Sequence, residues 1–412
     1  MNTSNSKYTT QPSRHLTCKN LTLYVSSIGL LPIFLSQPVI ASDNEHKAFV
    51  DFRLRYERVE QDNALKDADA LTLRTQLNFQ TATYHGFNAV IEFEDSRDVL
   101  SVDNYNDALG SNPAYSVVAD PNTTELDQGF LQYKGKGLTA KLGRQVIALD
   151  GQRFVGHVGW RQDRQTFDAF SVNYVNSGIS ATYAYITQRN RIFADERDVD
   201  SRDHLINVGY QARYGKFVAY GYLLEVDNGI SNDLDTFGLS FDGKANVNDI
   251  PVSYRAEYAT QSSENPTSDY DAEYVNLELG AKLAMATVKL GYELLGSDDG
   301  MYGFATPLAT LHKFNGWSDQ FLTTPSNGLE DIYLSVSAPV WHGNMAFIYH
   351  DYQADESLND IDDLGDEINL SYSQNFATHY SAGIKYAKYN AGDTLAGKVD
   401  TDKLWLWVGA KF

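Results

Sequence analysis

The chain has 412 residues, of which 42% are hydrophobic and 13% aromatic, and its formal net charge is −21 at pH 7. An acidic protein of this kind repels the phosphate backbone, so we do not expect it to bind nucleic acid. Tyrosine (27 residues) and phenylalanine (20) are abundant while proline (10) is rare, and this composition favours β-strands.

Residues 1–41 have the three parts of a secretory signal peptide. Cations without any acidic residue precede an apolar stretch from Leu21 to Ile40. The small residues Val39 and Ala41 then predict cleavage before Ser42. The alternative is a membrane-anchoring helix, which two prolines within the apolar stretch make less favourable.

The single cysteine, Cys18, lies before the apolar stretch and would leave with the signal peptide. The exported part, residues 42–412, would then have no disulfide and no cysteine-ligated metal. No later segment approaches the roughly 20 consecutive apolar residues of a transmembrane helix. The exported protein is therefore expected to be either soluble or a β-barrel.

An alternation of apolar and polar residues recurs from the start of the exported part to its end. In 275–283, Val275, Leu277 and Leu279 share one face of a strand while Asn276 and Glu278 share the other. Each alternating run is about ten residues long, as expected of a tilted transmembrane strand. The pattern indicates strands with one face toward lipid and the other toward a lumen.

We therefore predict that residues 42–412 form a single all-β domain, a transmembrane antiparallel barrel of eighteen strands, with sixteen as the alternative count. The predicted strands are 47–58, 70–83, 87–95, 125–134, 138–147, 164–175, 179–189, 203–214, 216–226, 235–242, 251–261, 273–283, 285–295, 329–338, 344–353, 367–374, 379–389 and 403–412. The last strand, which ends on Phe412, is expected to pair with 47–58 and close the barrel. An even strand number places both termini on the periplasmic side.

Short and long connections alternate along the chain. Short turns are predicted at 84–86, 135–137, 176–178 and 215–216. Long polar connections are predicted at 96–124, 148–163, 190–202, 227–234, 262–272, 296–328, 354–366 and 390–402. Outer-membrane barrels have short periplasmic turns and long external loops, so this rhythm favours a membrane barrel over a soluble sandwich or a β-helix.

Charged residues alternate with the apolar ones and are therefore assigned to the lumen. The cations are Arg53, Arg55, Arg74, Arg255, Lys282, Lys289 and Lys385, and the acids are Asp51, Glu57, Glu92, Glu94, Glu257, Glu278 and Glu293. On the lipid face an Arg or Lys would cost roughly 2–4 kcal/mol at the bilayer midplane. The charges either neutralise one another within the wall or form a conduit that selects solutes.

Two segments depart from the plain barrel pattern. Segment 142–169 is rich in glycine and contains Arg144, Arg153, Arg161 and Arg164. It could fold into the pore, where guanidinium groups bind carboxylates bidentately, or its arginines could pair with Asp150, Asp163 and Asp168.

Segment 304–325 is too apolar for a solvated loop. Its residues Leu308, His312, Phe314 and Trp317 are candidates for a plug or gate over the barrel mouth. The alternatives are a protein–protein contact and simple self-packing of a long loop.

The acidic excess is largest between Asp355 and Glu367, where seven acidic residues occur without a basic one. We expect a solvated external loop there, with divalent-cation bridging to lipopolysaccharide as the alternative. The spacing matches no Ca²⁺ loop motif.

Both unusual segments resemble the bacterial alginate-export porin family. The resemblance rests on Gly143-Arg144-Gln145, Arg153-Phe154, Trp160-Arg161 and the Thr306–Trp317 stretch. It implies a monomeric eighteen-stranded barrel with an arginine-lined pore that loops constrict, and it makes Arg144, Arg153 and Arg161 constriction candidates. The acids expected in the lumen depart from this pattern and put alginate itself in doubt.

These features predict a bacterial outer-membrane porin, exported by a cleaved signal peptide, for passive passage of hydrophilic, anionic solutes or oligosaccharides. The expected partners are the lipid bilayer, lipopolysaccharide and these solutes, with a monomer predicted and an oligomer left open. We expect no enzyme activity, catalytic residue, cofactor or metal, because the histidines are scattered without a recognisable catalytic spacing. The alternatives are a barrel enzyme of the lipase or protease type and a structural or adhesive barrel.

Overall fold

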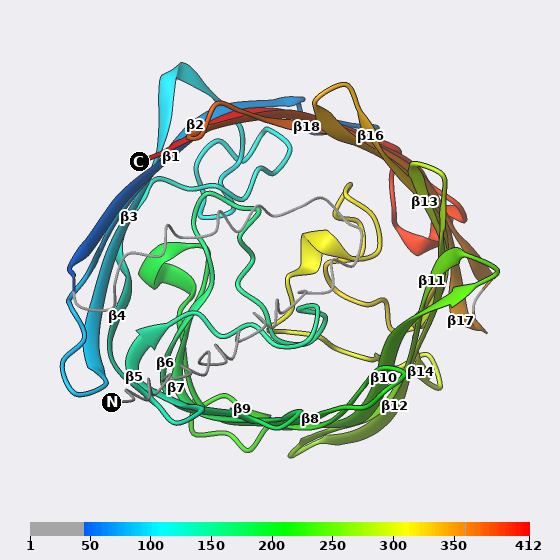
Figure 1. Ribbon diagram of the computed structural model, residues 1–412. Helices are drawn as coiled ribbons and strands as arrows, with labels where there is room; N and C mark the ends of the chain where they lie inside the picture. Colours follow the sequence, from blue (N-terminus) through cyan, green and yellow to red (C-terminus); the bar gives the residue numbers. More distant parts are fainter. Residues whose placement is uncertain (1–44, 359) are drawn as a thin grey trace, which may run out of the picture.

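The structure is a computed structural model that describes residues 45–358 and 360–412, so the predicted signal peptide lies outside the described residues. Among these residues, eighteen antiparallel strands form one sheet that closes on itself as a barrel (Figure 1). No helix in the described part of the chain is long and apolar enough to cross a membrane. The predicted fold class and strand number are confirmed.

The strands follow one another around the barrel in chain order. They are β1 (Lys47–Gln61), β2 (Ala68–Gln80), β3 (Phe87–Asn104), β4 (Thr123–Gly135), β5 (Leu138–Gln145), β6 (Thr166–Asn176), β7 (Ile179–Asn190), β8 (Val199–Gln211), β9 (Lys216–Glu225), β10 (Asp233–Val247), β11 (Ile250–Asn265), β12 (Ser268–Leu283), β13 (Ala286–Leu295), β16 (Leu329–Val340), β17 (Gly343–Leu358), β18 (Ile361–Phe376), β19 (Tyr380–Asn390) and β20 (Thr401–Lys411). The connections contain a small hairpin, β14 (Ser297–Asp298) with β15 (Tyr302–Gly303), and the 3₁₀ helices η1 (Ala194–Arg197), η2 (Leu311–Lys313) and η3 (Thr394–Ala396).

The last strand closes the barrel against the first, as predicted. Leu54 of β1 lies opposite Val408 of β20 in this register. The terminal residue Phe412 exchanges backbone hydrogen bonds with Val50, at 2.9 and 3.0 Å. Closure gives every strand two neighbours and leaves no edge of unpaired backbone groups for lipid to meet.

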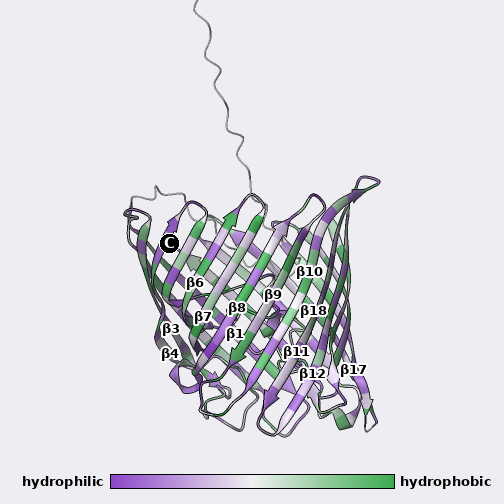
Figure 2. Cartoon of the chain, turned by 90° about the horizontal axis from the view of Figure 1, so that it is seen from below, coloured by the Kyte–Doolittle hydropathy of each residue, from purple (hydrophilic) through white to green (hydrophobic). Residues whose placement is uncertain are grey.

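The outer surface of the wall is apolar because every second side chain points away from the lumen. Leu142 and Leu239, for example, are 62% and 65% exposed. Figure 2 shows hydrophobic and hydrophilic residues alternating along the strands. This outer face suits the hydrocarbon of a bilayer and would be unfavourable in water.

The two ends of the barrel differ in their connections. At one end, which we call the short-turn end, β4 joins β5 through Lys136 and Gly137, whose φ angles are 51° and 81°. Positive φ at both positions matches the hairpin turns that follow the right-handed strand twist. The opposite end, the long-loop end, contains the long connections 105–122, 146–165 and 296–328.

Two connections predicted to be long are short hairpins instead. Strands β11 and β12 continue to Asn265 and Ser268, and Ser262 still lies opposite Asp271 in their register. Likewise β17 and β18 extend to Leu358 and Ile361, so the acidic segment expected to be a solvated loop is mostly strand. Beyond the apolar belt both faces of a hairpin meet water, and backbone pairing continues there without the alternation on which the prediction depended.

Candidate functional site

Two of the long connections fold back into the barrel. Residues 146–165, between β5 and β6, and most of residues 296–328, between β13 and β16, lie inside the ring of strands (Figure 1). Their backbones meet: Val155 and Leu308 form a parallel bridge, and the amide of Gly156 donates to the carbonyl of Leu308 at 2.8 Å. We call these two segments together the plug.

An aromatic core fixes the plug against the wall. Phe154 packs on Tyr220 of β9 and Tyr274 of β12, with ring centroids 5.4 and 5.0 Å apart. Phe304 and Leu308, from the second plug segment, are buried in the same cluster. Each fully buried side chain of this size stabilises the closed position by about 1.5–3 kcal/mol.

Arg161 joins the plug to the opposite wall. Its Nη1 lies 3.0 Å from a carboxylate oxygen of Glu57 on β1, and its Nη2 lies 3.0 Å from Asp319 in the second plug segment. Asp319 also forms an ion pair with Lys403 of β20, at 2.8 Å. Removing charges from water this completely costs several kcal/mol per ion, and this pairing offsets that cost.

The other arginines of the plug are paired in the same way. Arg153 donates to Glu293 of β13 at 2.7 Å and to Asn315 at 3.1 Å. Arg164 donates to Asp127 of β4 at 3.0 Å and also contacts Glu92. These ion pairs anchor the plug, and they neutralise the charge that these guanidinium groups could otherwise offer to a solute.

Two arginines of the wall donate hydrogen bonds to backbone carbonyl groups of the plug. Arg53 donates to the carbonyl of Gly159 at 3.1 Å and to the side chain of Gln162 at 2.9 Å. Arg55 contacts the carbonyl of Trp160 and the carboxylate of Asp120. Segment 146–165 is therefore held by the wall as well as by its own side chains.

A lysine on the wall is enclosed by plug aromatics. Lys385 of β19 lies 3.9 Å from the ring centre of Trp317 and 4.3 Å from that of Trp160, which allows cation–π attraction. Its Nζ is 2.6 Å from Nε2 of His312, and Nδ1 of His312 is 2.6 Å from Asp319. This chain of contacts assigns a neutral His312 that accepts from Lys385 and donates to Asp319.

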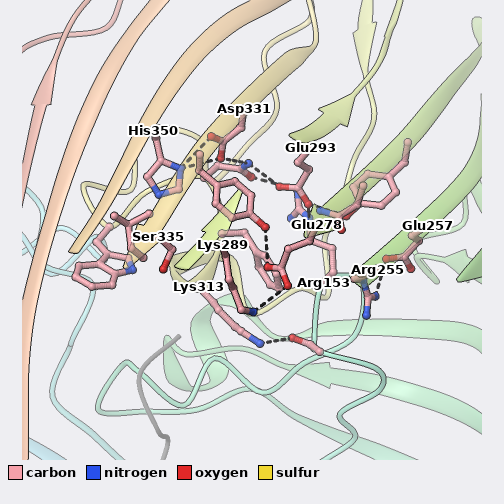
Figure 3. Close-up of a pocket in the computed structure, with 18 residues that line it drawn as sticks. Arg153, Arg255, Glu257, Glu278, Lys289, Glu293, Lys313, Asp331, Ser335 and His350 are labelled. Atoms are coloured by element: carbon pink, nitrogen blue, oxygen red, sulfur yellow. Dashed lines mark hydrogen bonds and ion pairs between the residues drawn. The ribbon is translucent and has the colours of Figure 1, made fainter. Parts of the chain in front are cut away.

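A cavity of about 70 Å³ lies between the plug and the wall from β11 to β17 (Figure 3). Charged side chains line it in pairs: Arg153 with Glu293 (2.7 Å), Arg255 with Glu257 (2.6 Å), Lys289 with Glu278 (2.8 Å) and His350 with Asp331 (2.9 Å). Aromatic rings of Phe314, Trp317 and Tyr333 complete the lining. The cavity thus combines aromatic surface with nearly balanced charge.

Lys313 is the exception to this pairing. Its Nζ donates to the carbonyl of Gly151 at 2.6 Å, and no carboxylate of the described residues forms an ion pair with it. Desolvation lowers its pKa to about 8, and the nearby positive charges of Arg255 and Lys289 add to the effect. Near neutral pH the ammonium group is still mostly protonated, so Lys313 places in the cavity a positive charge that has no carboxylate partner of its own among the described residues.

A model of the alginate export family matches residues 45–296 of the chain. The chain belongs to the alginate export family. A search of curated proteins finds no match in sequence.

Solved outer-membrane channels share the fold. OccAB4 of Acinetobacter baumannii aligns with a TM-score of 0.72 at 14% identity, covering 89% of this chain and 98% of that one. OccK9 of Pseudomonas aeruginosa gives 0.70 at 12% identity with the same coverage, and OpdK of that organism, solved with vanillate, gives 0.67 at 11% identity, also covering 89% and 98%. This alginate export family chain therefore has the barrel of an outer-membrane channel.

Most residues that the sequence singled out meet in this family member's lumen. Five constriction candidates and all four gate candidates lie within or against the plug: Arg53, Arg55, Arg153, Arg161, Arg164, Leu308, His312, Phe314 and Trp317. Two further constriction candidates, Arg255 and Lys289, line the cavity. Arg74 pairs with Asp51 at 2.7 Å. Lys282 lies one residue from the end of β12 at the short-turn end, exposed and away from the plug.

Arg144 does not join the constriction. Its side chain points to the outward face of β5, the same face as Leu142 and the opposite one to Gly143. There it pairs with Asp168 of β6 at 2.8 Å. The alternation itself contained this information, because residues two apart on a strand share a face. Lys313 and Asp319 were missed, although a charged residue in an otherwise apolar segment was a signal that could have found them.

The closed plug should weaken at acidic pH through His312. Burial lowers the pKa of His312 to about 3, an effect to which Lys385 adds and which Asp319 opposes. Since a solvent-exposed histidine has a pKa of about 6.5, the released plug binds a proton more readily than the closed plug. The contribution of neutral His312 to the stability of the closed position is therefore complete above about pH 6.5. This stabilising free energy decreases by up to ~1.4 kcal/mol per pH unit as the pH falls toward about 3.

Single-channel recordings at a series of acidic pH values would test this expectation. Open probability should increase as the pH falls in the parent protein, and His312→Gln should remove most of that dependence. An unchanged slope in the variant would assign the acid response to other groups.

Proposed function

We propose that this chain is a passive outer-membrane channel for small hydrophilic solutes, with a preference for those that carry a carboxylate. The observation that carries the proposal is Lys313, an ammonium group in the cavity that forms no ion pair with a carboxylate of the described residues. A carboxylate entering the cavity would gain a charge-assisted hydrogen bond without displacing an existing ion pair.

The comparisons support a channel in general terms. The fold matches barrels solved as outer-membrane channels, and the structure of OpdK was determined with vanillate, a small aromatic carboxylate. The aromatic lining of the present cavity, with Phe314 and Trp317 near Lys313, suits a solute with one apolar face and one anionic end. These neighbours are channels, which favours transport over the enzymatic and adhesive alternatives.

The closed plug favours small solutes over a polymer. Ion pairs tie both plug segments to β1, β4, β13 and β20, so the passage of a polyuronate chain would require the plug to leave this position. A small solute needs only local movement of the side chains around the cavity. We therefore assign the channel to monomeric anions.

Replacing Lys313 tests the proposal. In planar bilayers, a small aromatic carboxylate added to the bath should block the parent channel, and Lys313→Gln should weaken that block about tenfold, the effect of losing one charged hydrogen bond worth about 1.5 kcal/mol. The block should also weaken as the pH rises through about 8, where Lys313 loses its proton.

Lys398→Gln is the matched control. Lys398 contacts the carbonyl of Gln320 at 2.6 Å and is not among the residues that line the cavity, so this variant should behave like the parent. Equal block of the parent and Lys313→Gln would contradict the assigned carboxylate preference.

A further inference from the structure

A strip of polar side chains on the wall has no partners. Asn369, Ser371 and Ser373 follow one another at every second position of β18 and face the lumen. They are 0%, 5% and 7% exposed, and both amide atoms of Asn369 and both serine hydroxyls find no hydrogen-bond partner within the described residues. Buried polar groups are usually hydrogen-bonded, so a run of three such residues indicates a surface meant to meet polar groups.

The plug covers this strip through Trp317. Asn369 lies between Ile348 of β17 and Ala387 of β19, and both of these neighbours belong to the buried cluster that contains Trp317. Ser371 lies opposite Lys385, whose Nζ is 3.9 Å from the ring centre of Trp317. The indole therefore lies over the long-loop end of the strip.

A single carboxylate on the same strand holds Trp317 in place. Glu367 is two residues before Asn369 on β18 and accepts hydrogen bonds from the backbone amides of Trp317 and Ser318, the latter at 2.9 Å. The hydroxyl of Ser318 also donates to Glu367. The strand that carries the strip therefore also carries the carboxylate that holds Trp317 over it.

Trp317 separates the strip from the cavity. Together with Ile348 and Ser335 it lines the cavity described above, whereas Ser371 and Ser373 continue from Asn369 toward the short-turn end. Movement of the indole would expose, next to the cavity, polar groups that find no hydrogen-bond partner within the described residues.

We propose that Trp317 is the gate of the channel, and that its displacement opens a solute path along Asn369, Ser371 and Ser373. The path supplies one amide and two hydroxyl groups, which suit the hydroxyl groups of a hydrophilic solute. This proposal rests on the channel function and adds to it the route, the gating residue and a second class of solute contact.

Thiol accessibility tests the gate. The sequence has one cysteine, Cys18, in the predicted signal peptide, so a cysteine introduced into the barrel reports on its own position. Ser371→Cys should react slowly with a small anionic methanethiosulfonate reagent, and Trp317→Ala in the same protein should accelerate the reaction at least about tenfold, because it uncovers the strip. Once modified, the channel should conduct less current.

Ser240→Cys is the matched control. Ser240 faces the lumen from β10 and is 5% exposed, but it lies on another part of the wall from Trp317. Its labelling rate should not respond to Trp317→Ala. Glu367→Gln, which weakens the anchor and keeps the indole, provides a second way to open the gate if Trp317→Ala does not assemble.

The outcomes separate the two proposals. A parent protein that inserts as a barrel without conducting would overturn the channel function. A conducting parent whose Ser371→Cys reacts at the same rate with and without Trp317, or whose current is unaffected by labelling, would overturn the gate.

Discussion

Excision of residues 305–323 is expected to raise single-channel conductance by roughly an order of magnitude, because barrels of this strand number enclose an aqueous channel and, of the plug, mainly segment 146–165 would still occupy this one. The removed segment contains η2, Trp317 and Asp319. The hydroxyl of Thr324 donates to the carbonyl of Phe304 at 2.7 Å, so the two cut ends already lie together and a two-glycine linker can join them.

Conductance in planar bilayers measures the effect, and the exposed β9–β10 connection offers the control. Shortening residues 227–231, which are exposed, should leave the current unchanged. If excision of 305–323 in a folded barrel produced no increase, the plug would not be the main obstacle to flow.

Replacement of Asp319 by Asn is expected to release the plug from the wall. Asp319 accepts from Arg161 at 3.0 Å, Lys403 at 2.8 Å and His312 at 2.6 Å, so the change leaves buried positive charges facing one another. Breaking a buried ion pair by removing one partner costs about 3–5 kcal/mol. We expect this loss to fall on the closed position of the plug, since the strands keep their backbone ladder.

Limited trypsin digestion is the direct readout of plug release. Arg153, Arg161 and Lys313 are protected while the plug is closed and should become cleavage sites in Asp319→Asn. Asp299→Asn changes an exposed residue of the same connection and should be cleaved like the parent. Plug sites that stay resistant in Asp319→Asn would show that the aromatic core alone holds the plug.

The barrel was predictable because its wall separates two environments. Lipid on one side and the lumen on the other impose a period of two on every strand. Eighteen strands, with sixteen as the alternative, could be counted from that period and from the turns between the runs. Where strands β11, β12, β17 and β18 extend beyond the apolar belt, this constraint ends, and the predicted boundaries ended too early.

The plug network could not be read in the same way. Arg161 lies 104 residues from Glu57 and 158 from Asp319, and no local pattern connects residues so far apart. Pore entry was one interpretation of segment 142–169, and a plug or gate over the barrel mouth was one interpretation of 304–325. The structure brings the two segments together. The sequence offered pairing of the arginines with Asp150, Asp163 and Asp168 as an alternative. In the structure Arg153, Arg161 and Arg164 pair with other acids, which shifts attention to Lys313 as the cation that remains for a solute.

The most direct test of the central claim is the current carried by the purified, folded protein in a planar lipid bilayer with a salt gradient. We expect stepwise channel openings, with a reversal potential that shows anions to be more permeant than cations. A correctly folded barrel that inserts and carries no current, or one that favours cations, would contradict it.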